Sequence, residues 1–172
     1  SMYGSVPVRA MKKALLDLKA AGRLDRVRML SMTNCTFDGH VYNTLRVMQE
    51  CLAIKPDVLF LWDEAWFGFA RFSPFLRPRT AMGAAAALEE WRASPEALKA
   101  WQDQAKELGE DLDPKDKRLL ERRLVPDPRK IRLRVYETDS VHKSMSALRQ
   151  GSIVAVRDED YSQHVSAFRE AV

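Results

Sequence analysis

One apolar run constrains the fold of this chain more than any other feature. Residues 57–62 read Asp-Val-Leu-Phe-Leu-Trp, and two acids, Asp63 and Glu64, follow them directly. A short, near-continuous apolar run predicts a strand that is buried on both faces, as in a parallel sheet. Open α/β sheets bind ligands beyond the carboxyl ends of such strands. Because a buried carboxylate is costly without a partner, Asp63 needs either a structural partner or a ligand.

The order of the predicted elements indicates a layered α/β fold. The pattern predicts helices at about 7–21, 41–55 and 160–171, a helical part at about 80–124, and strands at 27–32, 57–62, 131–136 and 152–156. Strands that alternate with helices favour an αβα arrangement around a mostly parallel sheet with right-handed crossovers. Ser5, Ser94 and Asp113 each stand one or two residues before a proline and are predicted to begin helices.

Composition and charge exclude several classes of protein. The chain has 172 residues, 46% of them hydrophobic and 30% charged, which is typical of one globular domain. No apolar run approaches the roughly 20 residues that span a bilayer, and the N-terminus lacks a secretory pattern. Cys35 and Cys51 form neither a metal-binding spacing nor a disulfide framework. We therefore expect a cytoplasmic protein without a membrane partner.

The densest run of basic residues lies at 115–134, within a chain of net charge +4. Acidic residues interrupt this run, and no aromatic residues that could stack on bases are interleaved with it. The sequence therefore disfavours nucleic acid as a partner. A non-catalytic binding module that uses 115–134 stays open as an alternative function, and it predicts salt-sensitive binding.

Three polar segments, 34–38, 63–64 and 140–143, follow the first three predicted strands. The carboxyl ends of neighbouring parallel strands share one edge of a sheet, so these segments are expected to converge. They combine acids, hydroxyls, a histidine and a lysine, without metal-ligand spacing. Lys143 itself is open to two interpretations. It is either one more surface lysine or, in partly apolar surroundings, an amine with a depressed pKa that acts as a nucleophile.

These segments also carry a resemblance. Residues 33–39 (Thr-Asn-Cys-Thr-Phe-Asp-Gly), 63–66 (Asp-Glu-Ala-Trp) and 140–148 (Ser-Val-His-Lys-Ser-Met-Ser-Ala-Leu) occur in that order. Together they resemble the large domain of the pyridoxal-phosphate-dependent ornithine/lysine/arginine decarboxylases, which have the aspartate-aminotransferase fold. The resemblance implies that the strand after Lys143 runs antiparallel to the others. It also implies pyridoxal 5'-phosphate as the cofactor and a basic amino acid as the substrate.

The resemblance assigns a role to each matching residue. Lys143 is implied to be the internal-aldimine lysine, which forms a Schiff base with the cofactor aldehyde. Asp63 is implied to pair with the pyridine nitrogen, so that the ring acts as an electron sink. Ala65 resembles the small residue that packs on the ring face. Ser140 and His142 resemble the cofactor-contacting residues before the lysine, with Ser140 at the phosphate.

The first polar segment completes this implied site. Asn34, Thr36 and Asp38 are implied to line the wall nearby. The catalytic set expected from the resemblance is therefore Lys143, Asp63 and His142. An aminotransferase or a lyase of the same superfamily remains an alternative, because the sequence does not identify which substrate bond is broken.

The sequence also departs from the family. Val141 stands where the family motif has threonine, and the helical part at about 80–124 reads as an insertion specific to a subfamily. The family's phosphate loop at a helix N-terminus and its small domain have no counterpart in these 172 residues. We therefore expect a single partial domain, 1–172, that is inactive as an isolated fragment. Open sheet edges predict self-association into a homo-oligomer.

Overall fold

The computed structural model describes residues 4–146 and 150–171. One sheet holds the strands, which in spatial order are β1 (Met29–Thr33), β2 (Leu59–Asp63), β3 (Arg134–Ser140) and β4 (Ser152–Asp158). The first three strands run parallel, whereas β3 and β4 are antiparallel. The mixed sheet with an antiparallel last strand is therefore confirmed.

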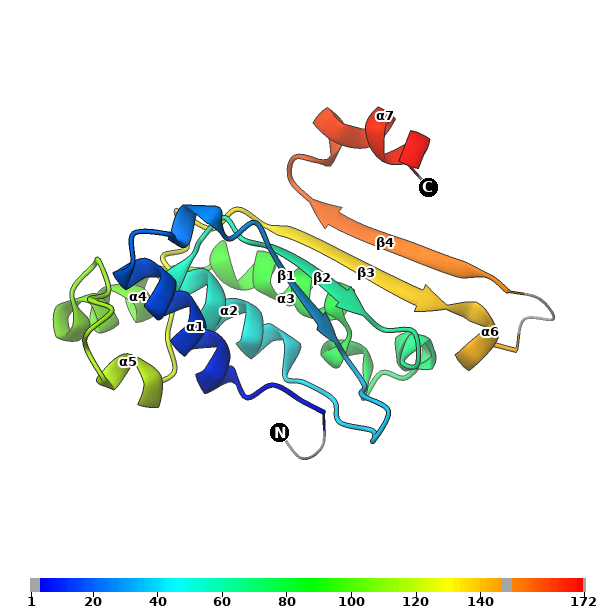
Figure 1. Ribbon diagram of the computed structural model, residues 1–172, viewed down its shortest axis with the longest axis horizontal. Helices are drawn as coiled ribbons and strands as arrows, with labels where there is room; N and C mark the ends of the chain where they lie inside the picture. The colour runs from blue at the N-terminus through cyan, green and yellow to red at the C-terminus, as the bar shows by residue number, and fades with distance from the viewer. Residues whose placement is uncertain (1–3, 147–149, 172) are drawn as a thin grey trace.

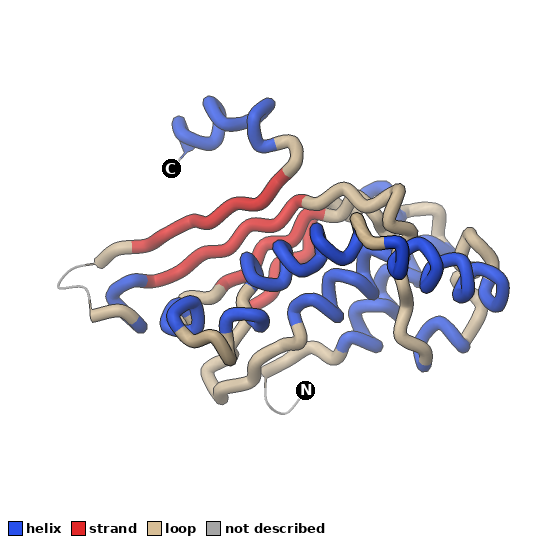
Figure 2. Tube along the Cα trace, turned by 180° about the vertical axis from the view of Figure 1, so that it is seen from behind, coloured by secondary structure: helices blue, strands red, loops and turns tan. Residues whose placement is uncertain are grey.

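Helices cover one face of this sheet. Figure 1 shows α1 (Val8–Ala20), α2 (Thr44–Ile54) and α3 (Ala81–Arg92) side by side. Figure 2 shows the same helices from the other side of the molecule. Successive right-handed crossovers that step in one direction place their helices on the same face of a sheet. On the opposite face, α7 (Tyr161–Ala171) packs Phe168 against Tyr136, with ring centroids 6.0 Å apart.

The helical part that follows β2 forms three α-helices, as expected. After α3 come α4 (Pro95–Leu108) and the short α5 (Arg118–Glu121). Leu88, Leu108 and Leu119 of these helices belong to the same buried cluster as Phe60 and Val135 of the sheet. The helical part is therefore packed into the core and does not stand apart from it.

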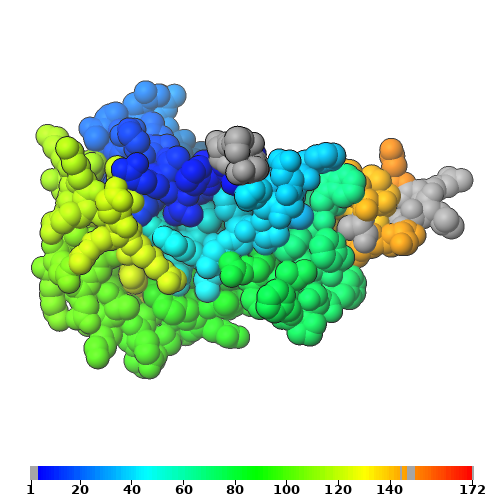
Figure 3. Space-filling view, turned by 90° about the horizontal axis from the view of Figure 1, so that it is seen from below, coloured from blue at the N-terminus to red at the C-terminus, as the bar shows by residue number. Residues whose placement is uncertain are grey.

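Single-turn helices complete the chain, and they are η1 (Leu24–Arg26), η2 (Gly68–Phe72), η3 (Arg77–Arg79) and α6 (Val141–Ser144). Figure 3 shows that the β3–β4 end of the molecule projects beyond the helical body. Within the described ranges 4–146 and 150–171, no helix is both long enough and apolar enough to cross a membrane.

The two faces of β2 differ in burial, contrary to the expectation of burial on both faces. Phe60 and Trp62 are fully buried against the helices. Leu59 and Leu61 point to the other face and are half-buried, and neighbouring Met29 is 48% exposed. The reason is topological, because both crossover helices lie on one side and α7 packs only near β3 and β4.

The predicted N-caps agree with the structure at one helix and differ from it at two. The Ser94 side chain accepts the Ala97 N–H at 3.3 Å, so this N-cap is confirmed. The Ser5 prediction was wrong, because α1 begins at Val8 with a proline as its N-cap. The Asp113 prediction was also wrong. Its carboxylate accepts the Lys115 N–H at 2.9 Å in a tight turn, and α5 begins further along the chain.

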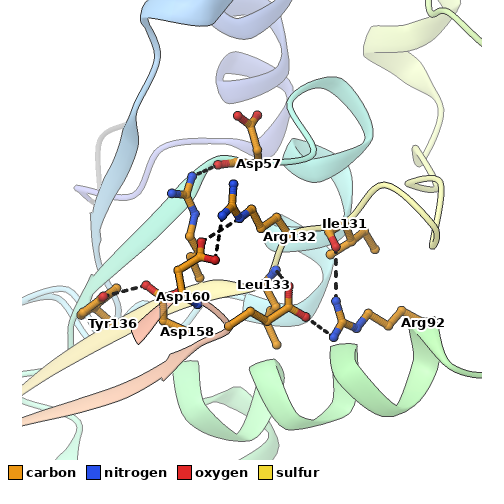
Figure 4. A network of polar contacts seen from close by, with 10 residues as sticks. Asp57, Arg92, Ile131, Arg132, Leu133, Tyr136, Asp158 and Asp160 are labelled. Atoms are coloured by element: carbon orange, nitrogen blue, oxygen red, sulfur yellow. Dashed lines mark hydrogen bonds and ion pairs between the residues drawn. The ribbon is translucent and has the colours of Figure 1, made fainter. Parts of the chain in front are cut away.

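A polar network joins the end of β4 and the turn after it to the start of β3 (Figure 4). Arg132 pairs with Asp160 at 2.7 Å, and the Tyr136 hydroxyl donates to Asp158 at 2.7 Å. Arg92 of α3 pairs with Glu159 in the same turn. These contacts fix the turn between β4 and α7 against β3, which holds the antiparallel strand in register.

Candidate functional site

Three polar segments meet at the carboxyl edge of the parallel strands. The Asn34 N–H donates to the Asp63 carbonyl at 2.9 Å, which joins the segment after β1 to the end of β2. The Glu64 N–H donates to the Thr138 carbonyl at 2.8 Å, which joins the segment after β2 to β3. The structure therefore brings together the segments that sequence spacing had placed at one edge.

Asp63 is the last residue of β2, and its side chain is exposed at this edge. One carboxylate oxygen accepts the Ala65 N–H at 3.0 Å, a local turn that fixes the direction of the side chain. Within the part of the chain that the structure describes, no ion pair involves Asp63. The partner expected for Asp63 is thus a backbone N–H, and the Asp63 carboxylate remains exposed to solvent.

Lys143 lies on α6 and reaches the same loop. Its Nζ is 5.4 Å from the ring centroid of Trp66, which is a cation–π contact. Phe37, from the segment after β1, meets Trp66 edge-on at 6.3 Å between ring centroids. Lys143 is exposed, and the aromatic surface of Trp66 lies beside its amine.

Ser140 and His142 flank the turn into α6. Ser140 is the last residue of β3, although the sequence placed it beyond a strand ending at Tyr136. His142 is exposed, and its Nδ1 lies 3.3 Å from the Gly151 carbonyl oxygen. Residues 147 and 148 of the motif lie outside the described residues.

Asn34 and Thr36 shape the wall from inside. Asn34 is fully buried, and its Nδ2 donates to Glu64 Oε1 at 2.7 Å and to the Arg79 carbonyl at 2.9 Å. Its Oδ1 accepts the Tyr42 N–H at 3.1 Å. Thr36 is buried and accepts the His40 N–H at 3.2 Å, whereas Asp38 on the same turn is exposed. Asn34 therefore acts as a bridge between loops.

Sequence reasoning missed a carboxyl cluster formed by Glu64, Glu137 and Asp139. Each residue is at most 4% exposed, and one oxygen from each lies within 4.8 Å of the others. Glu64 Oε1 accepts the Ala81 N–H at 2.8 Å, and Glu137 Oε2 accepts the Met82 N–H at 2.9 Å. Both donors belong to the first turn of α3. The available signal was the alternation of Val135, Glu137 and Asp139, which a longer predicted β3 would have turned inward.

Burial and mutual repulsion alter the acidity of this cluster. Desolvation, with repulsion from Glu137, raises the pKa of Glu64 to about 8. Desolvation likewise raises the pKa of Glu137 to about 7 and raises that of Asp139. Burial and the charge of Glu64 raise the pKa of Cys35 nearby. The cluster therefore retains protons near neutral pH.

The basic run at 115–134 is largely neutralised by its own neighbours. Arg118 pairs with Asp116 at 2.7 Å, Arg129 with Asp127 at 2.9 Å, and Arg132 with Asp160 at 2.7 Å, the last two partners being largely buried. These ion pairs reduce the free positive charge of the run. This segment gives no support to a nucleic-acid interface.

Comparison with known proteins assigns the family. Residues 2–91 match the Orn/Lys/Arg decarboxylase major domain, a span that includes Asp63 and stops before Lys143. The biodegradative arginine decarboxylase of Escherichia coli is 29% identical over 140 residues, covering 81% of this chain and 13% of that protein. Lysine decarboxylase LdcA of Pseudomonas aeruginosa is 32% identical over 88 residues, covering 48% of this chain and 12% of its own length.

The chain thus spans about an eighth of the length of these relatives. No solved structure matches it. The family match covers half of the residues, and both relatives are named as decarboxylases, one of arginine and one of lysine. This chain therefore belongs to the ornithine/lysine/arginine decarboxylase family, in the part that corresponds to the major domain.

Proposed function

We propose that this chain carries the pyridine-nitrogen and lysine part of a pyridoxal-phosphate site in a decarboxylase of arginine, lysine or ornithine. The observation that carries the proposal is the meeting of the Asp63 loop and the Lys143 helix. Lys143 Nζ contacts Trp66, three residues after Asp63, at the carboxyl edge of the sheet. This is the edge where α/β sheets bind ligands.

The residues present fit this cofactor. A pyridine nitrogen requires an anionic partner, and the Asp63 carboxylate is exposed with its direction fixed by the Ala65 N–H. An aldehyde requires an amine, and Lys143 supplies one on the neighbouring segment. Half-buried Ala65 presents a small surface that suits a flat ring. We extend the site to Ser140 and His142, which lie before the lysine at the end of β3.

The roles of the chain follow from these positions. When bound, the cofactor accepts the electron pair that a departing substrate carboxylate leaves behind. Asp63 holds a proton on the pyridine nitrogen by electrostatic attraction, which maintains that capacity. Lys143 would hold the cofactor at its aldehyde through the side-chain amine, and the same amine would be the group on this chain that moves a proton there. Trp66 limits the positions of the Lys143 side chain, and Asn34 with buried Thr36 braces the wall behind Asp63.

The test is an activity assay on the full-length product of the gene, supplied with pyridoxal phosphate. We expect CO₂ and an amine from arginine, lysine or ornithine, with activity lost in K143A and strongly reduced in D63N. The matched control is Asp25→Asn, which changes an exposed acid on η1 outside the candidate site and should leave the rate unchanged. Keto-acid formation without CO₂ release would favour the aminotransferase alternative and refute decarboxylation.

Self-association is part of the proposal. Several large apolar side chains are exposed on the segments that follow β1 and β2, and these are Phe37, Trp66, Phe69, Phe72 and Phe75. Contiguous exposed apolar surface marks interaction sites in soluble proteins. We propose that a second copy of the chain, in a dimer or a higher oligomer, covers this surface.

A further inference from the structure

We propose that Glu64, Glu137 and Asp139 form a proton-sharing clamp, in which buried carboxyl groups held together by protons join the Asp63 loop, strand β3 and the first turn of α3. The clamp is a conformational device sensitive to alkaline pH. Its existence does not depend on the proposed function, whereas its effect on cofactor binding does.

The clamp joins three separate elements. Glu64 belongs to the loop after β2, whereas Glu137 and Asp139 alternate along β3 on its helix-facing side. The carboxyl groups converge, with one oxygen from each within 4.8 Å of the others. The Ala81 and Met82 N–H groups then connect Glu64 and Glu137 to α3.

Two oxygens in the cluster lack a donor. Glu64 Oε2 and Asp139 Oδ1 are buried, and among the described residues neither has a hydrogen-bond partner. A buried anionic oxygen without a donor is strongly disfavoured, because burial removes the water that would otherwise donate to it. A carboxyl proton supplies the missing donor, because a protonated carboxyl both donates and accepts. The orphaned oxygens therefore point to shared protons.

The charges that surround the cluster do not neutralise it. The exposed Arg71 of η2 acts on Glu137 and Asp139, and Asp63 at the end of β2 adds a further negative charge. From the segment after β1, Cys35 faces Glu64 as a thiol, and Asn34 contributes a neutral amide donor. The first turn of α3 contributes only backbone N–H groups.

The balance is therefore one exposed cation against three buried acids and Asp63. None of the ion pairs in the described part of the chain includes a carboxyl of the cluster. Buried like charges do not all ionise together. Protons must supply the remaining neutralisation unless a metal ion does.

The local dipoles oppose a bound metal ion and stabilise carboxylate charge, so the shared protons follow from burial and from the two oxygens without donors. The cluster lies at the N-terminus of α3, whose positive end and free N–H groups favour negative charge and repel cations. The donors from Ala81, Met82 and Asn34 already point at carboxyl oxygens, which a cation would need for itself. A divalent cation is therefore the rival that the experiment has to exclude.

The clamp has a direct consequence for the candidate site. Glu64 is the residue after Asp63, and Glu137 and Asp139 lie on the strand that leads through Ser140 to the Lys143 helix. While the carboxyl groups share protons, these segments stay joined at fixed spacing. Once the groups ionise, they repel one another and the two segments separate. Glu64 is thus a positioning residue for Asp63.

The sign of the pH dependence follows from the acids. Their pKa values in the folded chain lie above those in the unfolded chain, so the folded chain binds more protons between about pH 4.5 and 8. The contribution of these protons to the free energy of unfolding is complete below about pH 4.5. It declines as the pH rises and is lost once the pH has passed about 7 to 8. Each excess proton changes the ratio of folded to unfolded chain by about tenfold per pH unit.

The experiment compares the urea-unfolding equilibrium of the chain between pH 5 and pH 9 in wild type, E64Q and E90Q. Glutamine keeps the acceptor for Asn34 and Ala81 and removes the titration, so E64Q should flatten the decline. Glu90 is an exposed acid of α3, and E90Q should decline as wild type does. Equal slopes in wild type and E64Q would overturn the proposal.

A direct measurement covers the case in which E64Q does not fold. Carbon-13 NMR of the wild-type chain, labelled at Glu and Asp carboxyl carbons, should show cluster carboxyls still protonated at pH 7. Carboxyls that are all ionised at pH 6 would overturn the proposal. So would a rise in Tm on adding Mg²⁺ or Mn²⁺ that is absent in E64Q, because that result identifies a metal site.

Discussion

Asn34 provides the sharpest test of how the site is held together. Its amide nitrogen donates two short hydrogen bonds, to Glu64 and to the Arg79 carbonyl, beside a long one of 3.5 Å to the Thr44 hydroxyl, and its oxygen accepts the Tyr42 N–H. After Asn34→Ala the two acceptors keep other donors, the Ala81 N–H at 2.8 Å and the Thr44 hydroxyl at 2.6 Å. The Tyr42 N–H loses its partner.

The magnitude follows from these three contacts. Loss of each hydrogen bond whose acceptor keeps another donor costs about 1 kcal/mol. The part-buried Tyr42 N–H that loses its acceptor costs about 1 kcal/mol or more. We therefore expect Asn34→Ala to lower the free energy of unfolding by about 3 kcal/mol. The assay is urea denaturation of the chain at pH 6, where the carboxyl cluster remains protonated.

Asn43 offers a matched control. It is an exposed N-cap of α2, and its side chain accepts the Arg46 N–H at 3.3 Å. Loss of such a cap costs about 1 kcal/mol. If Asn34→Ala destabilises the chain no more than Asn43→Ala does, Asn34 does not bridge the loops and the reasoning fails.

Three further outcomes can be measured on the same chain. Gly83→Ala should destabilise strongly in urea, because an added Cβ would lie 2.1 Å from the Arg77 carbonyl oxygen and force the turn before α3 to move. Lys12→Met should lower the free energy of unfolding by about 2 kcal/mol, since it removes the 2.6 Å ion pair to buried Glu50 Oε2 and leaves Arg46 as the other partner of that carboxylate. Phe75→Ser removes an apolar side chain that is 86% exposed, so sedimentation should show weaker self-association while urea stability is unchanged.

The layered α/β arrangement could be predicted from the sequence because pattern and topology agree. The apolar run before Asp63 and the alternation of strands and helices are local signals with a limited set of solutions. The convergence of the Asp63 and Lys143 segments then follows from parallel strands that share an edge. The antiparallel direction of β4 came from the family resemblance, since strand pattern alone does not encode direction.

The carboxyl cluster could not be predicted because it depends on tertiary context. Glu137-Thr138-Asp139-Ser140 is polar throughout and reads as a loop, which ended the predicted strand at Tyr136. In the structure, pairing with both β2 and β4 extends β3 to Ser140 and turns the two acids toward α3. Local propensity is overridden here by strand pairing on both sides.

The alternative of a binding module on 115–134 makes a different prediction. It requires salt-sensitive affinity for nucleic acid and indifference to Lys143. The pairing of Arg118, Arg129 and Arg132 with neighbouring acids reduces the free charge that such binding needs. Filter binding at low and high salt would detect it.

Trapping of pyridoxal phosphate on lysine tests the central claim most directly. The full-length product of the gene is incubated with the cofactor and reduced with borohydride, and the modified lysines are mapped by mass spectrometry. Lys143 should be modified faster than Lys106, a lysine whose side chain is 75% exposed, and D63N should remove that preference. If Lys143 reacts no faster than Lys106 in the wild-type chain, Asp63 and Lys143 do not form a cofactor site and the account is wrong.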